Sequence, residues 1–330
     1  MTSSSTPGGT LLALLPWLVA LAIAAAVPLF LPIYMQRVAV TCLMFVTLGV
    51  SWNLSGGFAG QLSLGQAAFF GIGAYGSMIT AEHVTSDLLT SIVVGGIVAG
   101  LCTPILFPAF RLRGIYLGMA TFALGESMRV VAEKVFPGEA SGLHTPVVFA
   151  VDSLAPYYWA LGIAAFTIAV GAWTIRSRLG LGLMTVREDD QAARSIGVPV
   201  ALYKAIVFAI GAFATGLAGG FYARYLGFID PHSVFHLDHS INPVFVTIIG
   251  GIGTELGPIV GAIFWVILQE VLRGLTDTPA VNTIIYGLLL LVVILVVPRG
   301  IVGESQAIWR RIADRRRGRR TGKEIPVVAD

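Results

Sequence analysis

The stretch GFAGQLSLGQAAFFGIGAYG, from Gly57 to Gly76, interrupts the apolar character of this chain with glycines and polar side chains. Residues 53–66 combine four glycines with the amide and hydroxyl groups of Asn53, Ser55, Gln61, Ser63 and Gln66. If this region lies in a membrane, each polar group needs a partner, because an unpaired polar group in hydrocarbon costs several kcal/mol. The stretch therefore predicts a glycine-broken helix whose polar groups are paired inside the protein.

The composition of the whole chain indicates a membrane protein. Of its 330 residues, 56% are hydrophobic and 12% are charged, whereas a typical soluble domain has roughly 25% charged residues. Several apolar runs reach the roughly 20 residues that a helix needs to cross a bilayer. We therefore expect an all-α, polytopic integral membrane protein. Cys42 and Cys102 both fall inside apolar runs, which favours neither a disulfide framework nor a zinc site.

About ten membrane segments are predicted from the apolar runs between polar or Gly/Pro breaks. They cover residues 11–33, 36–54, 58–80, 88–109, 114–135, 154–175, 205–226, 240–252, 256–273 and 281–298. The first has no basic region before it, so we interpret it as a membrane helix rather than a cleaved signal peptide. The segments 240–252 and 256–273 are short, and are either tilted spans or the arms of a broken segment that meet at GGIGTELGP.

The distribution of basic residues predicts that both termini face the cytoplasm. In that orientation, sixteen of the 21 lysines and arginines fall on cytoplasmic segments, as the positive-inside rule expects. Nine of the sixteen lie in the tail 299–330, which we treat as a basic cytoplasmic segment that binds anionic lipid, next to a membrane domain over 1–298. The arginines of this tail are not interleaved with aromatic residues, so nucleic acid is not expected as a partner.

The predicted cytoplasmic loop 176–204 has a charged centre. Arg187, Glu188, Asp189, Asp190 and Arg194 place five charges within eight residues. Thr185 and Glu188 form a capping-box pattern, and Gly197 is a left-handed stop signal. These signals predict one helix of about three turns, about 16 Å long.

One face of this predicted helix is expected to be apolar. Val186, Ala193 and Ile196 fall near one face, with Ala192 beside them. Small side chains allow another protein to approach closely, which favours a docking element. A solvated connector between two spans is the alternative.

Four stretches of the chain resemble one known family. GFAGQLSLGQAAFFGIGAYG closely resembles the signature of branched-chain amino-acid ABC permeases of the LivM/LivH type. RLRGIYLGMATFALGE (Arg111–Glu126), AFATGLAGGFYARYLGFIDP (Ala212–Pro231) and IIGGIGTELGPIVGA (Ile248–Ala262) resemble the same family. The resemblance implies the transmembrane subunit of an ATP-driven importer in a bacterial inner membrane. Its implied substrate is a branched-chain or other hydrophobic amino acid, and urea or a short amide is the alternative.

The charged loop has a resemblance of its own. QAARSIG, from Gln191 to Gly197, resembles the E-A-A-x-x-x-G core of the cytoplasmic loop in bacterial ABC importer permeases, with Gln191 in place of the glutamate and without the I-x-L-P that follows in many members. In that family the loop is a coupling helix that docks into a cleft of the ATPase subunit. The resemblance thus implies ATPase contacts at Glu188, Asp190, Gln191, Ala192, Ala193 and Gly197.

The same resemblance implies several partners. They are ATPase subunits, a second permease subunit that is a copy or a homologue, and a periplasmic or lipid-anchored solute-binding protein. The chain has no G-x-x-x-x-G-K-[ST] motif, so we expect no enzymatic activity and no cofactor here, and ATP and Mg²⁺ on the partner ATPase. A secondary transporter driven by an ion gradient is the rival interpretation. It requires a series of titratable groups, and Glu126 is the only clearly central acid.

Candidate residues for the substrate path come from the two glycine-interrupted regions, 56–65 and 250–258, because such pairs point to the substrate site of a transporter. The predicted residues are Asn53, Gln61, Ser63, Gln66, Gly250, Gly251 and Gly253. Interhelical packing is the alternative for each glycine. Glu126 is a further candidate, because an acid near mid-membrane depth usually faces the protein interior. An ion pair with Arg129 that only joins helices is the alternative.

The segment DPHSVFHLDH contains His232, His236 and His239. A zinc site is one interpretation, because His232 and His236 share a face if the segment is helical. We expect instead a polar outer loop without metal.

Overall fold

The computed structural model describes residues 7–112, 114–136, 143–144, 148–150, 153–275, 284–285, 287–288, 292, 295 and 300–305. Its helices are α1 (Pro7–Ala26), α2 (Ile33–Trp52), α3 (Gln66–His83), α4 (Leu88–Leu101), α5 (Ile115–Val135), α6 (Ala155–Arg176), α7 (Arg178–Glu188), α8 (Asp190–Ser195), α9 (Val200–Leu226), α10 (Pro231–Val234), α11 (Asp238–Gly250) and α12 (Gly257–Leu275). Shorter helical turns are η1 (Val27–Leu29), the π-helical η2 (Asn53–Phe58) and η3 (Thr103–Arg111). The antiparallel strands β1 (Leu143–His144) and β2 (Phe228–Ile229) are two residues each.

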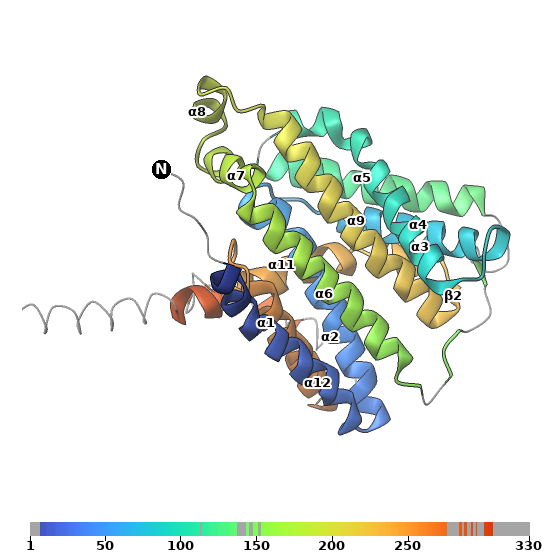
Figure 1. Ribbon diagram of the computed structural model, residues 1–330. Coiled ribbons are helices and arrows are strands. Elements are labelled where there is room, and N and C mark those ends of the chain that lie inside the picture. Colours follow the sequence, from blue (N-terminus) through green and yellow to red (C-terminus); the bar gives the residue numbers. More distant parts are fainter. Residues whose placement is uncertain are drawn as a thin grey trace, which may run out of the picture.

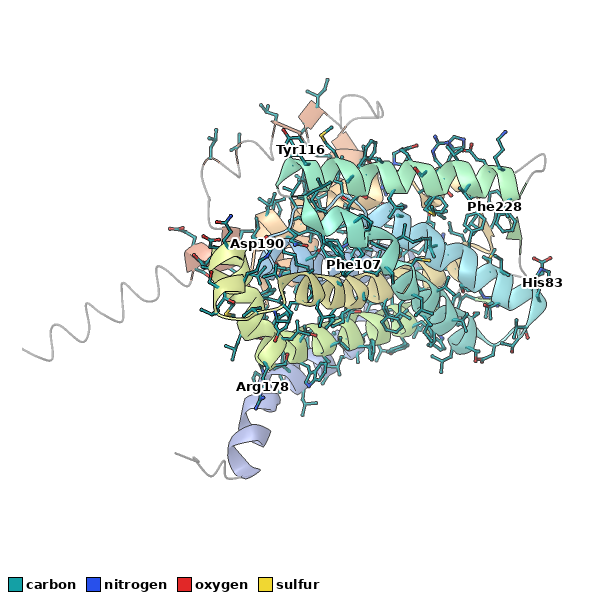
Figure 2. The ribbon with its side chains drawn as sticks, turned by 90° about the horizontal axis from the view of Figure 1, so that it is seen from above. His83, Phe107, Tyr116, Arg178, Asp190 and Phe228 are labelled. Atoms are coloured by element: carbon teal, nitrogen blue, oxygen red, sulfur yellow. The ribbon has the colours of Figure 1, made fainter. Side chains whose placement is uncertain are left out.

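The long helices form a bundle with two distinct ends (Figure 1). Helices α7 and α8 lie at one end and β2 at the other, and we call these the α7–α8 end and the β2 end. Figure 2 shows the same division in a second view, with Arg178 and Asp190 opposite His83 and Phe228.

At the β2 end, Asp87 accepts hydrogen bonds from the Thr90 amide (2.8 Å) and hydroxyl (2.6 Å) at the start of α4. These bonds lower the pKa of the Asp87 carboxyl.

Glycines let α3, α4 and α9 pack with their backbones in contact. A Cβ on Gly73 of α3 would lie 2.3 Å from the carbonyl oxygen of Gly216 in α9. A Cβ on Gly95 of α4 would lie 2.4 Å from the carbonyl oxygen of Gly73. Small residues at helix crossings allow this approach in membrane proteins. The many glycines of the chain therefore have a packing role in this three-helix unit.

Helix α2 lies at the centre of the remaining helices and packs against α6, α9, α11 and α12. Its buried residues Val46 and Val50 share a core with Ile249 of α11 and Trp265 of α12. Helix α1 is attached at the edge, where the Tyr157 hydroxyl of α6 donates to the Ala24 carbonyl at 2.7 Å.

The all-α class agrees with the prediction, and the boundaries of several expected spans change. Among the described residues, five helical segments are long and apolar enough to cross a membrane: Ile33–Phe58, Leu88–Phe110, Ala155–Arg176, Val200–Leu226 and Gly257–Gly274. The expected span 58–80 starts too early, because α3 begins only at Gln66. The expected span 281–298 lies largely outside the described residues. The number of ten spans remains a prediction.

The helical structure is interrupted within GGIGTELGP, residues 250–258, as its glycines predict. Helices α11 and α12 run in opposite directions, and residues 251–256 between them are not helical. At the far end of α12, Glu270 accepts a hydrogen bond from the Tyr34 hydroxyl at the start of α2. The 13 residues of α11 span about 20 Å at roughly 1.5 Å per residue, less than the roughly 30 Å hydrocarbon core.

Close packing at Gly73 gives a test of the three-helix unit. Gly73→Ala should lower the stability of the detergent-solubilised protein by about 1–3 kcal/mol, because the new methyl group meets backbone that cannot move aside. The matched control is Gly162→Ala in α6, where a Cβ meets nothing within 4 Å, and where alanine stabilises a helix by up to about 1 kcal/mol. Thermal unfolding followed by size-exclusion chromatography measures both. Equal stability of the two variants would contradict this packing.

Candidate functional site

The break after α2 is held by hydrogen bonds from within the protein. The π-helical turn η2 ends at Phe58, and residues 59–65 follow without helical structure. The Gln61 backbone N–H donates to the Ser55 carbonyl (2.9 Å), and the Leu64 backbone N–H donates to the Thr121 hydroxyl of α5 (2.9 Å). The Trp52 indole donates to the Ser63 carbonyl (2.8 Å). These bonds satisfy backbone groups that lose their helical partners at the break.

Asn53 joins this first break to the second one at 251–256. Its carboxamide oxygen accepts a hydrogen bond from the Gly253 amide (2.9 Å), and its nitrogen donates to the Thr254 carbonyl (2.9 Å). The Asn53 residue is only 3% exposed. Gly253 adopts a φ of +74°, which favours glycine at this position. The two glycine-interrupted regions that the sequence pairs are therefore in direct contact.

The other polar candidates divide into two groups. Ser63 and Gln66 are buried, and Gln66 accepts a hydrogen bond from the Thr215 hydroxyl of α9. Both line an internal cavity of about 10 Å³, about the volume that one water requires. Gln61 is also buried, but its side-chain oxygen and nitrogen have no hydrogen-bond partner among the described residues.

Gly250 and Gly251 are positions of close approach. A Cβ on Gly250 would lie 1.8 Å from the Gly257 carbonyl oxygen at the start of α12. The helical residues 300–305 also reach this break, because a Cβ on Gly300 would lie 2.4 Å from the Gly251 Cα. These contacts support the packing interpretation of both glycines.

The charged insert forms two helices, and the prediction of one helix begun by a Thr185–Glu188 capping box is wrong. Thr185 lies inside α7, where its hydroxyl donates to the Gly182 carbonyl (2.7 Å), and α7 ends at Glu188. Asp189 then begins α8, because its carboxylate accepts from the Gln191 amide (2.6 Å) and the Ala192 amide (3.3 Å). Asp189, directly before α8, thus caps the second helix, and Thr185 does not act as a capping residue. Gly197 has the predicted left-handed conformation, with a φ of +86°.

The two alanines of α8 face opposite ways. Ala193 is 1% exposed and packs with Val186 and Val200, whereas Ala192 is exposed. Ile196, expected on the same face as Ala193, is 71% exposed. The expectation of a shared apolar stripe is therefore confirmed for Val186 and Ala193 and wrong for Ile196, which lies at the C-cap of α8 beyond its last helical residue. Ala192 and Ile196 are the apolar residues of α8 and its end that another protein can reach.

A buried ion pair attaches α8 to α9. The Lys204 ammonium lies 2.8 Å from the Asp190 carboxylate, and their side chains are 5% and 12% exposed. Sequence analysis assigned Asp190 to the docking surface, but this contact directs it into the chain. Removing one partner of such a pair leaves an uncompensated buried charge. The pair therefore fixes the position of α8 on the bundle.

Two arginines connect the region 176–204 to the breaks. The Arg176 guanidinium, at the end of α6, pairs with Glu255 in the second break at 2.8 Å. Arg187 of α7 lies against both breaks: a Cβ on Gly60 would lie 3.1 Å from its Cγ, and a Cβ on Gly253 would lie 2.5 Å from its Nη1. A displacement of α7 would therefore reach both breaks through Arg187. Neither arginine is a predicted site residue: Arg187 appears in the sequence only as one of the charges of the insert, and Arg176 only as a basic residue at the start of the loop 176–204.

Glu126 lies apart from this site. Arg129 pairs with Glu126 at 2.9 Å and also with Glu133, all on α5, and the Glu126 side chain is 41% exposed. The predicted Glu126–Arg129 pair is present, but both residues belong to α5, so the expectations that it joins helices and that Glu126 faces the interior are wrong. The structure does not bring Glu126 to the Asn53 contact, and its place in a substrate path remains a prediction.

The three histidines have separate partners. The His239 ring stacks on Phe70 with centroids 4.1 Å apart. His236 lies 3.3 Å from Asp238, and His232 lies 3.4 Å from Glu133. Within the described part of the chain, no group of three or more His, Cys, Asp or Glu residues is arranged to hold a metal ion.

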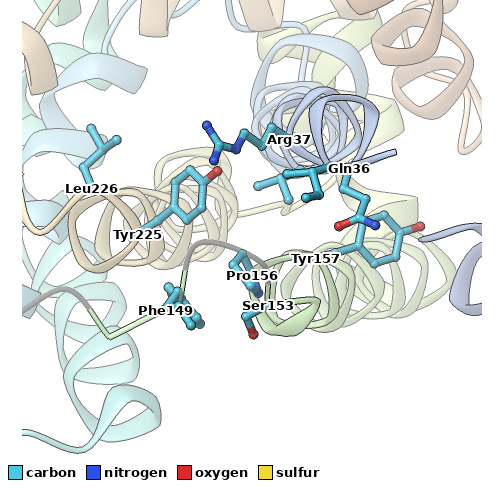
Figure 3. A pocket seen from close by; sticks show the side chains of 11 residues that line it. Gln36, Arg37, Phe149, Ser153, Pro156, Tyr157, Tyr225 and Leu226 are labelled. Atoms are coloured by element: carbon cyan, nitrogen blue, oxygen red, sulfur yellow. The ribbon is translucent and has the colours of Figure 1, made fainter. Parts of the chain in front are cut away.

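A second cavity lies at the β2 end, between the starts of α2 and α6 and the end of α9 (Figure 3). It has a volume of about 240 Å³. Gln36 is held by bonds to the Pro28 (3.1 Å) and Leu31 (2.9 Å) carbonyls, and the Arg37 guanidinium lies beside the Tyr225 ring. Sequence analysis placed no candidate here, although Arg37 is one of the five basic residues outside the predicted cytoplasmic segments.

Comparison with known proteins identifies the family. A family model described as "Branched-chain amino acid transport system / permease component" matches residues 34–294. The chain belongs to this family. The match covers α2 to α12, and so includes both breaks, Asn53 and residues 176–204, which we call the α7–α8 region. No solved structure matches the chain.

Several curated proteins are similar to this family member. The high-affinity branched-chain amino acid transport system permease protein LivM of Escherichia coli is 26% identical over 272 residues, 73% of this chain and 64% of that protein. A probable LivM of Methanocaldococcus jannaschii is 21% identical, over 80% of this chain and 92% of that protein. The autoinducer 2 import system permease protein LsrC of Yersinia pseudotuberculosis is 27% identical over 59% of this chain and 57% of that protein. This chain thus aligns with slightly less than two thirds of the Escherichia coli protein.

The Asn53 contact predicts a stability effect. Asn53→Ala should destabilise the protein by about 2–3 kcal/mol, because it removes two hydrogen bonds of about 1 kcal/mol each and leaves buried backbone groups unpaired. Ser55→Ala should cost less than about 1 kcal/mol, because the Ser55 hydroxyl donates only to the nearby Trp52 carbonyl. Thermal unfolding in detergent compares them. A smaller effect at Asn53 than at Ser55 would show that the contact does not hold the breaks together.

Proposed function

We propose that this chain is the transmembrane permease subunit of an ATP-driven importer for branched-chain or other hydrophobic amino acids. Family membership and the LivM relatives support the transported class. ATP and Mg²⁺ are bound by a separate ATPase. A second permease subunit completes the path, and a solute-binding protein delivers the substrate at the β2 end. The membrane is the bacterial inner membrane.

One observation carries this proposal: the α7–α8 region contacts both breaks of the bundle. Arg176 pairs with Glu255 at 2.8 Å, and Arg187 lies against Gly60 and Gly253. An ATPase that moves α7 and α8 would therefore move residues 59–61 and 251–256 together. Asn53, in the η2 turn that leads into residues 59–61, is hydrogen-bonded to Gly253 and Thr254 and so links the two segments. Such a connection is what coupling of ATP hydrolysis to transport requires.

The docking surface in this proposal is the exposed side of α8, with Ala192 and Ile196. Ala192→Trp and Ile196→Glu should give a folded permease that no longer co-purifies with the ATPase, because a well-packed interface residue contributes about 2 kcal/mol or more. Val84→Trp, at the β2 end and 77% exposed, is the matched control. Ala193→Trp should instead misfold, because Ala193 is buried against Val186 and Val200.

The assay combines ATPase co-purification, ATP hydrolysis stimulated by leucine-loaded binding protein, and leucine uptake by proteoliposomes. If Ala192→Trp and Ile196→Glu fold and retain all three, the docking assignment is wrong. If the native chain yields leucine uptake without any ATPase, driven by an ion gradient, the proposed function itself is wrong.

The orientation predicts which end reacts from outside the cell. In a background with Cys42 and Cys102 replaced by alanine, Glu82→Cys should react with a membrane-impermeant thiol reagent in intact cells, and Ser195→Cys should not. Glu82 precedes His83 at the end of α3 and Ser195 ends α8, which begins at Asp190; Figure 2 shows His83 and Asp190 at opposite ends of the bundle. After permeabilisation both should react. Labelling of Ser195→Cys in intact cells would place α8 outside and exclude its contact with an ATPase.

A further inference from the structure

The α7–α8 end contains a cavity that shares Gly60 and Arg187 with the proposed coupling contacts. It has a volume of about 340 Å³ and opens between residues 59–61, the start of α5 and helices α7 to α9. This volume lies within the roughly 300–1,000 Å³ of small-molecule sites. One wall is apolar, formed by Leu112, Leu117 and Val186. The other walls include amide, basic and acidic side chains.

Gln61 is the first sign of a ligand in this cavity. It is 5% exposed and lines the cavity. Neither its Oε1 nor its Nε2 atom has a hydrogen-bond partner among the described residues. A buried amide without partners is costly, and native proteins usually pair such groups with protein, water or ligand. A polar ligand in the cavity would supply the missing partner.

Both basic and acidic side chains line the cavity together with Gln61. Within the described structure, neither the Arg187 nor the Glu188 side chain forms a hydrogen bond or an ion pair, and both line the cavity. Lys204 and Asp190 are different, because they neutralise each other at 2.8 Å. Asp189 uses its Oδ1 atom to begin α8, and its Oδ2 atom forms no hydrogen bond with the described residues. Among the described residues that line the cavity, Arg187 is a cation without an ion pair, Glu188 and Asp189 have carboxylate oxygens without hydrogen-bond partners, and the Gln61 amide is unpaired beside an apolar wall.

We propose that this cavity binds a free aliphatic amino acid from the cytoplasm. The carboxylate lies toward Arg187 and the Gln61 nitrogen, the ammonium toward Glu188, and the aliphatic side chain against Leu112 and Leu117. The inference rests on the proposed function for its orientation and substrate class. Because a ligand here contacts both the first break and α7, it holds these elements together. Accumulated amino acid on the cytoplasmic side should therefore slow ATP hydrolysis.

Direct binding tests the cavity. Radiolabelled L-leucine is titrated onto the purified permease–ATPase complex in detergent, without solute-binding protein, and also onto the permease alone. Saturable binding should weaken at least tenfold in Gln61→Leu and in Glu188→Gln. Glu82→Gln, the same chemical change on an exposed residue at the β2 end, should bind like the native chain. Leucinamide and 4-methylpentanoate, which lack the carboxylate and the ammonium, should compete at least tenfold less well than leucine.

Folding is checked independently in each variant. Gln61→Leu should keep its melting temperature, because no partner of Gln61 within the described structure is lost. In proteoliposomes with the ATPase facing outward, leucine added on the ATP side should reduce hydrolysis stimulated by the binding protein, and Gln61→Leu should weaken that inhibition.

Three results would overturn the inference: no saturable leucine binding, binding that neither cavity variant weakens, or leucinamide and 4-methylpentanoate that compete as well as leucine. The first two leave the proposed function intact if stimulated hydrolysis and uptake are observed. If the complex instead fails to form or to transport, the proposed function fails, and leucine binding to the permease alone still decides whether the cavity takes an amino acid.

Discussion

The structure depends on one constraint: hydrocarbon offers no hydrogen-bond partners, so backbone that leaves a helix must find partners inside the protein. Two segments leave their helices at the same end of the bundle, residues 59–65 and 251–256. The Asn53 carboxamide is a donor to one backbone group and an acceptor from another in the second segment. Trp52 and Thr121 supply side-chain partners in the first. A polar side chain at the end of α2 thus makes two irregular segments compatible with a membrane domain.

The α7–α8 region is built on this pair of breaks. Arg176 and Arg187 contact them from α6 and α7, and the Lys204–Asp190 pair attaches α8 to α9. The region is therefore a part of the bundle rather than a solvated connector. Mechanically, this matters because a loosely tethered loop absorbs a displacement, whereas an element held by buried contacts transmits it.

The glycines have two physical roles. In α3, α4 and α9 they remove side chains where backbones meet, as at Gly73 and Gly216. At Gly197 and Gly253 they allow a positive φ where a helix ends or a loop turns. Packing glycines stabilise a fixed unit, and turning glycines shape the ends of helices at the α7–α8 end.

The sequence by itself determined the all-α class, the presence of the two glycine-interrupted regions and the left-handed stop at Gly197. Composition and glycine spacing are local properties, and they persist in any tertiary arrangement. The sequence could not determine that Asp189 divides the charged insert, because a capping box and an N-cap compete within four residues. It also could not show that Ala193 faces inward or that Arg187 reaches Gly60 and Gly253. Those facts depend on how α7, α8 and α9 pack, since contacts between residues distant in the chain exist only after the helices assemble.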